Sequence, residues 1–119
     1  MIVSRTNLQG CHPERSAKRV VEGSSHRFPV VQCTGFTLEY QIHEVLKGNL
    51  NGNFRYEVYV RQTDGNWKSV ELFQMEGYET TLEIRFDKIM DIDAVAVVCG
   101  KKDKVYFSYT IAVRDVRSA

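Results

Sequence analysis

Apolar and polar residues alternate along several segments of the chain, and this alternation is its clearest structural signal. In the first such segment, Phe36, Leu38, Tyr40 and Ile42 alternate with polar or charged residues. A period of two residues is typical of a β-strand that turns one face to the core and one face to water. We therefore predict four half-buried strands, at residues 36–42, 54–60, 80–86 and 105–113.

Two further segments are strand-like for other reasons. Residues 92–99 are apolar on both faces, as expected of a central strand that is covered twice. Residues 28–33 contain Pro29, which confines a strand to the edge of a sheet. With the strand that follows the Asp-Gly turn at residues 64–65, the chain has about seven short strands, and no segment indicates a helix. This pattern predicts an all-β protein, a single antiparallel β-sandwich.

The strand order resembles immunoglobulin-like and fibronectin type III-like modules. The resemblance covers residues 28–116, where "FTLEYQI", "FRYEVYVRQTDGNWKSV", "TTLEIRF", "DAVAVVCG" and "VYFSYTIAV" look like strands B, C–C′, E, F and G. It implies that the last two strands are neighbours in one sheet, joined at the basic turn "GKKDK". Immunoglobulin domains place a Trp soon after the first core cysteine, whereas Trp67 lies far beyond Cys33. The resemblance therefore carries over the sandwich but not the immunoglobulin disulfide.

The Asp-Gly pair at residues 64–65 predicts a hairpin whose register depends on the length of its loop. A two-residue loop would place Val58 opposite a glutamate. A three-residue loop with a glycine bulge places Val58 opposite Val70 and Tyr56 opposite Leu72. A shift of one residue moves every side chain to the other face, and only the second register pairs apolar with apolar residues. We therefore predict the three-residue loop.

This register also predicts which side chains the hairpin presents to water. Arg61 would lie beside Trp67, where a cation–π contact contributes about 0.5–1 kcal/mol. Glu57 would face Glu71, and two facing carboxylates repel one another. The predicted outward-facing strip consists of three aromatic residues and two arginines, namely Trp67, Tyr59, Phe73, Arg61 and Arg55.

Three interpretations of this strip remain open. A second layer or the N-terminal segment covers the rings, which are common in sheets. Alternatively, the strip binds another protein, because Trp, Tyr and Arg contribute most of the energy of protein interfaces. In the third interpretation the rings stack on the apolar faces of sugar rings, with Arg55 or Glu57 orienting the sugar by hydrogen bonds.

The N-terminal residues 1–27 differ from the rest of the chain. They hold five basic and two acidic residues, a balance of +3, so that the remaining 92 residues balance at −2 within the total of +1. They show no period, and we predict a disordered basic tail followed by a sandwich domain at residues 28–119. Residues 11–25 resemble the peptides encoded by repeated intergenic elements of bacterial genomes, which implies that the tail need not be native coding sequence.

Composition narrows the classes of partner. A net charge of +1 and 43% hydrophobic residues are those of an ordinary globular domain and do not favour nucleic acid as a partner. No segment approaches the roughly 20 apolar residues of a membrane helix. As written, the chain lacks a secretory signal, which predicts a cytoplasmic protein. If the true N-terminus is missing, a secreted or cell-surface location is expected instead.

Candidate reactive and metal-binding residues are few. The acidic residues Asp87, Asp91 and Asp93 supply oxygen ligands suited to Ca²⁺, but their spacing does not match an EF-hand loop. His43 with Cys33 or Cys99 would form a catalytic pair only if the fold brought them together. The odd cysteine count favours reduced thiols, and a disulfide between Cys33 and Cys99 across the sandwich is the alternative if the domain is exported. No motif for a cofactor or a phosphate loop is present.

These observations favour a non-catalytic binding or adhesion module rather than an enzyme. The module would recognise a protein or a carbohydrate through an outer sheet face. The alternative is a cytoplasmic structural protein that forms a homodimer through an exposed sheet edge.

Overall fold

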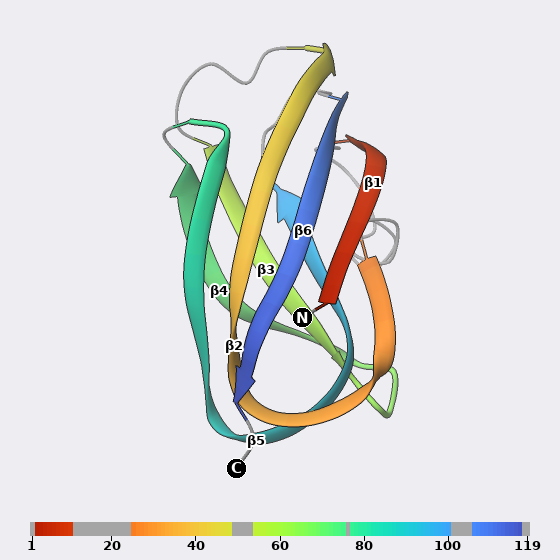
Figure 1. Cartoon of the computed structure of the whole chain (residues 1–119), viewed down its shortest axis with the longest axis vertical. Coiled ribbons are helices and arrows are strands. Elements are labelled where there is room, and N and C mark those ends of the chain that lie inside the picture. The colour runs from red at the N-terminus through yellow and green to blue at the C-terminus, as the bar shows by residue number, and fades with distance from the viewer. Residues whose placement is uncertain (1, 11–24, 49–53, 76, 101–105, 118–119) are drawn as a thin grey trace.

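The fold was established from a computed structural model, which describes residues 2–10, 25–48, 54–75, 77–100 and 106–117. These residues are almost entirely extended (Figure 1). The strands are β1 (Ile2–Gly10), β2 (Ser25–Lys47), β3 (Phe54–Gln62), β4 (Trp67–Met75), β5 (Glu79–Cys99) and β6 (Tyr106–Arg117). The predicted all-β class is confirmed. Among the described residues no helix is long and apolar enough to cross a bilayer.

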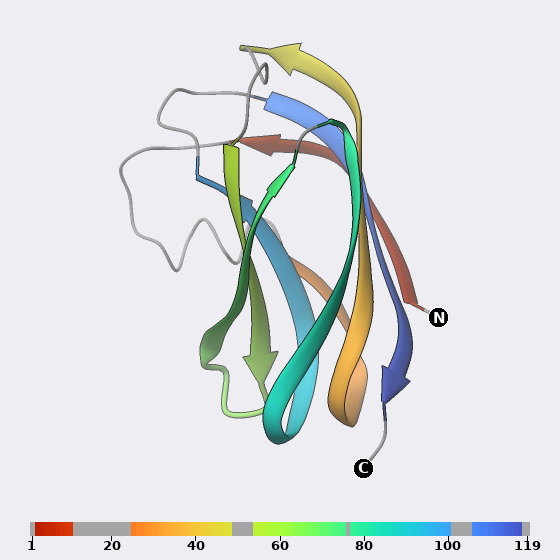
Figure 2. The same ribbon diagram turned by 90° about the vertical axis from the view of Figure 1, so that its left-hand side faces the viewer.

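Within the described ranges all strand pairs are antiparallel, and the six strands there form one sheet in the order β1-β6-β2-β5-β3-β4. The two longest strands, β2 and β5, pair with each other along two separate stretches. Residues 35–41 of β2 pair with residues 79–85 of β5, whereas residues 25–33 pair with residues 90–96. Between these stretches both strands curve, so that the sheet folds back over itself (Figures 1 and 2).

The curve divides the sheet into two layers, which we name after their central strands. The β6 layer contains β1, β6, residues 35–47 of β2 and residues 79–85 of β5. The β3 layer contains β3, β4, residues 25–33 of β2 and residues 90–99 of β5. Side chains from both layers meet between them and form the core.

Gly35 occupies the bend of β2, where the register shifts between Cys33 and Gly35. A Cβ atom at this position would overlap the backbone carbonyl oxygen of Ile84 on β5. Glycine is therefore required because the two backbones approach too closely for a side chain.

Most of the core consists of residues that the alternation assigned to the inner faces. Phe36, Leu38, Val58, Val60 and Phe107 are completely buried. Burial of each such side chain contributes about 1.5–3 kcal/mol. The core also contains several tyrosines, and the ring of Tyr40 contacts those of Tyr56 and Tyr109 at centroid distances of 5.7 and 5.5 Å.

The number of strands differs from the prediction. Residues 28–33 and 36–42 belong to one continuous strand, β2, and residues 80–86 and 92–99 to another, β5. The alternation detected the straight parts of each strand, but the connecting residues also remain extended around the bend. Within the described residues, the first part of β2 pairs only with β5, which agrees with the edge position predicted from Pro29.

The N-terminal region also differs from the prediction of a disordered segment over residues 1–27. Ile2–Gly10 forms β1, which pairs with β6, and β2 already begins at Ser25. The backbone groups along the edge of β6 provide hydrogen-bonding partners that only the folded sheet creates. Residues 11–24, which hold most of the segment that resembles an intergenic repeat, lie outside the described residues.

The last strand occupies a different place from that implied by the immunoglobulin resemblance. β6 lies between β1 and β2 and is not a neighbour of the second part of β5 in the sheet. The hairpin expected between the last two strands is therefore not formed. Its basic turn lies mainly in residues 101–105, which are outside the described part of the chain.

Cys33 and Cys99 are both buried, and they are not joined to each other. Cys33 pairs with Met90, nine residues before Cys99 on β5. At about 3.3 Å per strand residue, the two thiols lie too far apart to form a disulfide.

Candidate functional site

The turn between β3 and β4 is the predicted three-residue loop. The backbone N–H of Gln62 donates to the carbonyl of Asn66 at 2.9 Å, and that of Gly65 donates to the carbonyl of Gln62 at 2.9 Å. Gly65 has a φ of 88°, the left-handed conformation that the glycine bulge requires. The Asp64 carboxylate accepts the backbone N–H of Asn66 at 2.9 Å. The conformation of this turn is therefore set by its own residues, as the sequence predicts.

The register is as predicted only near the turn. Arg61 pairs with Trp67 and Tyr59 with Ser69, but a bulge follows between Tyr59 and Val58. Beyond it, Val58 pairs with Glu71, so the predicted pairs of Val58 with Val70 and of Tyr56 with Leu72 are wrong.

The bulge changes which side chains of β4 face the core. Phe73 is buried, only 9% exposed, and its ring stacks on that of Tyr56 with centroids 5.2 Å apart. Leu72 is instead 61% exposed. Phe73 and Met75 together bury more apolar surface than Leu72 and Gln74 would, which favours this register. The prediction that Phe73 belongs to an outward-facing strip is therefore wrong.

The remaining outward residues form a compact group on the β3 layer, which we call the hairpin face. Tyr59 and Trp67 are each partly exposed, so that neither ring is sealed in the core. Arg55 lies on β3 with Tyr59 and is exposed. It lies beyond the bulge, opposite Gln74. The hairpin face consists of Glu57, Tyr59, Arg61, Trp67, Ser69 and Asp93.

Arg61 is held by a two-point ion pair with Asp93 of β5. Its Nε and Nη2 atoms donate to the two carboxylate oxygens at 2.8 and 2.7 Å, and each side chain is 19% exposed. The hydrogen bond from Arg61 lowers the pKa of Asp93 below its usual value, with a further contribution from the positive charge of Arg27. Arg61 is therefore fixed in position beside Trp67. The predicted cation–π contact between them stays a prediction.

Glu57 connects Tyr59 and Ser69, the part of the hairpin face further from the turn. Its carboxylate accepts hydrogen bonds from the Tyr59 hydroxyl at 2.8 Å and from the Ser69 hydroxyl at 2.5 Å. Burial and this carboxylate raise the pKa of Tyr59 to about 12. The predicted repulsion between Glu57 and Glu71 does not arise, because the bulge places Leu72 opposite Glu57.

The structure does not assemble the candidate calcium site. Asp87 and Asp91 are exposed, and Asp93 is engaged with Arg61. Among the described residues no three His, Cys, Asp or Glu side chains are grouped closely enough to hold a metal ion.

The candidate catalytic pair is not formed either. His43 is exposed, and its Nε2 lies 2.5 Å from the hydroxyl of Thr110 on the outer face of the β6 layer. Cys33 and Cys99 belong to the buried core on the other side of the sheet. Burial raises the pKa of the Cys33 thiol, which disfavours the reactive thiolate.

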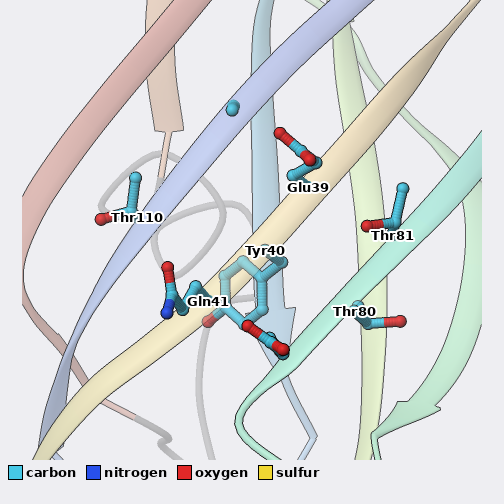
Figure 3. A pocket seen from close by; sticks show the side chains of 8 residues that line it. Glu39, Tyr40, Gln41, Thr80, Thr81 and Thr110 are labelled. Atoms are coloured by element: carbon cyan, nitrogen blue, oxygen red, sulfur yellow. The ribbon is translucent and has the colours of Figure 1, made fainter.

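A second group of polar residues lies on the outer face of the β6 layer, and the sequence analysis did not identify it. It lines a hollow of about 550 Å³ (Figure 3). The alternation predicts that Glu39, Gln41, Thr81 and Thr110 face water. Only the pairing of β6 with β2 and of β2 with β5 places them together. The polar residues of the hollow are Glu39, Gln41, Glu79, Thr80, Thr81 and Thr110.

No protein-family model, no curated protein and no solved structure matches this chain.

Proposed function

We propose that this protein is a non-catalytic recognition module that binds another protein through the hairpin face. The observation that carries this proposal is the arrangement of Trp67, Tyr59 and Arg61. Two partly exposed rings and a guanidinium lie together on one rigid surface, fixed by ion pairing and hydrogen bonding within the sheet. These residue types contribute most of the binding energy at protein interfaces.

The fixed geometry reduces the entropy cost of binding. Arg61 and Tyr59 are already restrained by Asp93 and Glu57, so a partner need not immobilise them. In addition, the indole Nε1 of Trp67 is buried and has no acceptor among the described residues. A buried donor without a partner costs about 1–3 kcal/mol, which an approaching carbonyl would recover after a small side-chain movement.

A protein suits this surface better than a carbohydrate. With Phe73 in the core, the three-ring platform that a sugar chain would follow is reduced to Tyr59 and Trp67. The polar groups around them also bond mainly to one another, which leaves few free groups for sugar hydroxyls. Exposed Leu72 adds an apolar neighbour that fits a protein interface.

The framework that carries this face is proposed to be a β-sandwich of the immunoglobulin or fibronectin type III kind in a broad sense. Support comes from the two facing layers and from the adjacency of β5, β3 and β4, which correspond to strands F, C and C′. The position of β6 beside β2 departs from that plan.

Self-association through β4 remains the alternative, but the features of this edge do not favour it. Lys68 and Glu71 are exposed on β4, and the bulge interrupts its regular ladder. Charges and bulges on an edge strand hinder pairing with a second copy.

The proposal is tested by capturing partners on immobilised full-length protein and measuring the affinity of each captured protein for purified variants. We expect Trp67→Ala to weaken binding by about 10-fold or more, since truncating a central aromatic residue costs about 2 kcal/mol. Tyr78→Ala is the matched control, because Tyr78 is 50% exposed but lies outside the hairpin face. Equal affinity of wild type and Trp67→Ala would refute the proposal.

A further inference from the structure

The hollow on the β6 layer is separate from the hairpin face, because the two lie on the outer sides of opposite layers. Its side chains come from three neighbouring strands, β6, β2 and β5 (Figure 3). The small side chain of Ala112 also lines it, so that a ligand can approach the sheet closely. Its volume of about 550 Å³ lies within the range of roughly 300–1,000 Å³ that is usual for small-molecule sites.

The charge of the hollow is partly neutralised from within the protein. The Nε of Arg114 donates to the Glu39 carboxylate at 2.6 Å, and its Nη2 contacts the other carboxylate oxygen. Glu79 is exposed and forms no ion pair with the part of the chain that the structure describes. The charges of Glu39, Arg114 and Glu79 therefore sum to about −1, and this charge attracts a cationic ligand only weakly.

The other polar groups of the hollow both donate and accept hydrogen bonds. Gln41 and Thr81 are exposed, and they lie on the same face of adjacent strands. The amide of Gln41 has a donor and an acceptor, and each threonine hydroxyl serves as either. The hydroxyl of Thr110 is oriented by His43, whose Nε2 lies 2.5 Å away. A ligand that offers several neighbouring groups of both kinds matches this set.

We propose that the hollow binds a neutral carbohydrate. Adjacent hydroxyl groups on a sugar ring donate to a carboxylate such as Glu79 while accepting from an amide such as Gln41. A short oligosaccharide can also extend along a hollow that is lined by three neighbouring strands. Tyr40, the ring beneath the hollow, is only 1% exposed and offers no stacking surface, so we expect weak binding, with dissociation constants near about 1 mM.

The test uses full-length protein and an array of neutral oligosaccharides, with decalysine as a cationic probe. Dissociation constants of the bound oligosaccharides are then measured by NMR titration. We expect at least one neutral oligosaccharide to bind, and Gln41→Ala to weaken it about fivefold to tenfold, as expected for one or two lost hydrogen bonds. Thr37→Ala is the matched control on the same face of β2, outside the hollow.

Two further results distinguish this site from the alternatives. If Trp67→Ala abolishes sugar binding while Gln41→Ala does not, the sugar binds at the hairpin face and the proposal is overturned. If decalysine binds in place of all sugars and Glu79→Gln removes that binding, the hollow is a site for cationic peptides instead. The absence of any bound oligosaccharide overturns the proposal as well. If the affinity for a protein partner does not change in Trp67→Ala, the proposed function is refuted, but the test of the hollow is unaffected.

Discussion

The two layers of the sheet are built from the same kind of alternating segment, yet they follow the simple pattern to different extents. In the β6 layer, residues 35–41 of β2 pair with residues 79–85 of β5 without interruption, and the register shifts between β2 and β6 lie outside residues 37–42. In the β3 layer, a bulge interrupts the β3–β4 ladder, and a second irregularity lies between β3 and β5 at Arg61. The difference teaches that alternation assigns faces reliably only where no residue is inserted between paired strands.

The polar surfaces of the two layers differ as well. Near the bulge, Glu57 accepts from Tyr59 and Ser69, and near the second irregularity Arg61 binds Asp93. On the β6 layer, Glu39 pairs with Arg114, but Gln41 and Thr81 remain exposed around a hollow. These different surroundings are the basis for our two proposals, protein recognition at the β3 layer and carbohydrate binding at the β6 layer.

The largest expected effect tests the bulged register of the β3 layer. Phe73→Ala should lower the free energy of unfolding by about 3–5 kcal/mol, because it removes a buried ring that stacks on Tyr56. Leu72→Ala should change it by less than about 0.5 kcal/mol, since Leu72 is 61% exposed. Urea denaturation followed by circular dichroism measures both values. A large loss of unfolding free energy for Leu72→Ala, with a small loss for Phe73→Ala, would instead support the register without the bulge.

The next effect tests the bend that separates the two layers. Gly35→Ala should cost about 1–3 kcal/mol, because the added methyl group overlaps the backbone carbonyl of Ile84. Gly77→Ala is the control, since nothing lies within 4 Å of a Cβ atom placed there. The same denaturation experiment applies, and equal stabilities of the two variants would contradict the close approach at Gly35.

The smallest effect concerns a contact between the layers. His26, on the first part of β2, lies with its Nε2 3.2 Å from the hydroxyl of Tyr109 on β6, and the two rings meet edge to face. Burial lowers the pKa of His26 below its usual value of 6.5. The unfolded chain therefore binds a proton more readily than the folded one. The resulting stability is fully present above pH 6.5 and decreases as the pH falls through that value.

Replacing His26 should remove this part of the pH dependence. We expect His26→Gln to flatten the free energy of unfolding between about pH 7 and pH 5, relative to wild type. His43→Gln is the control, because His43 is exposed on the same strand. Urea titrations at a series of pH values provide the measurement, and an unchanged slope in His26→Gln would contradict the lowered pKa of His26.

The hairpin face shows how much of a candidate site can be predicted from the sequence alone. Tyr59, Arg61 and Trp67 were predicted to face outward together, and their register agrees with the prediction because the Gly65 turn fixes it locally. The placement of Phe73 was wrong because the bulge depends on what the core can accommodate. The partner of Arg61 was missed, since Asp93 follows 32 residues later and reaches it only through the pairing of β3 with β5.

By itself, the sequence determined the extended conformation, the inner or outer face of most residues, and the type of the β3–β4 turn. These properties depend on alternation and on the conformational freedom of glycine, which act over a few residues. Only the tertiary structure decided that β2 and β5 continue around a bend, that β6 lies beside β2, and that a polar hollow forms across three strands. These features arise from contacts between residues that are distant in the chain, and the choice among such pairings depends on how the whole core packs.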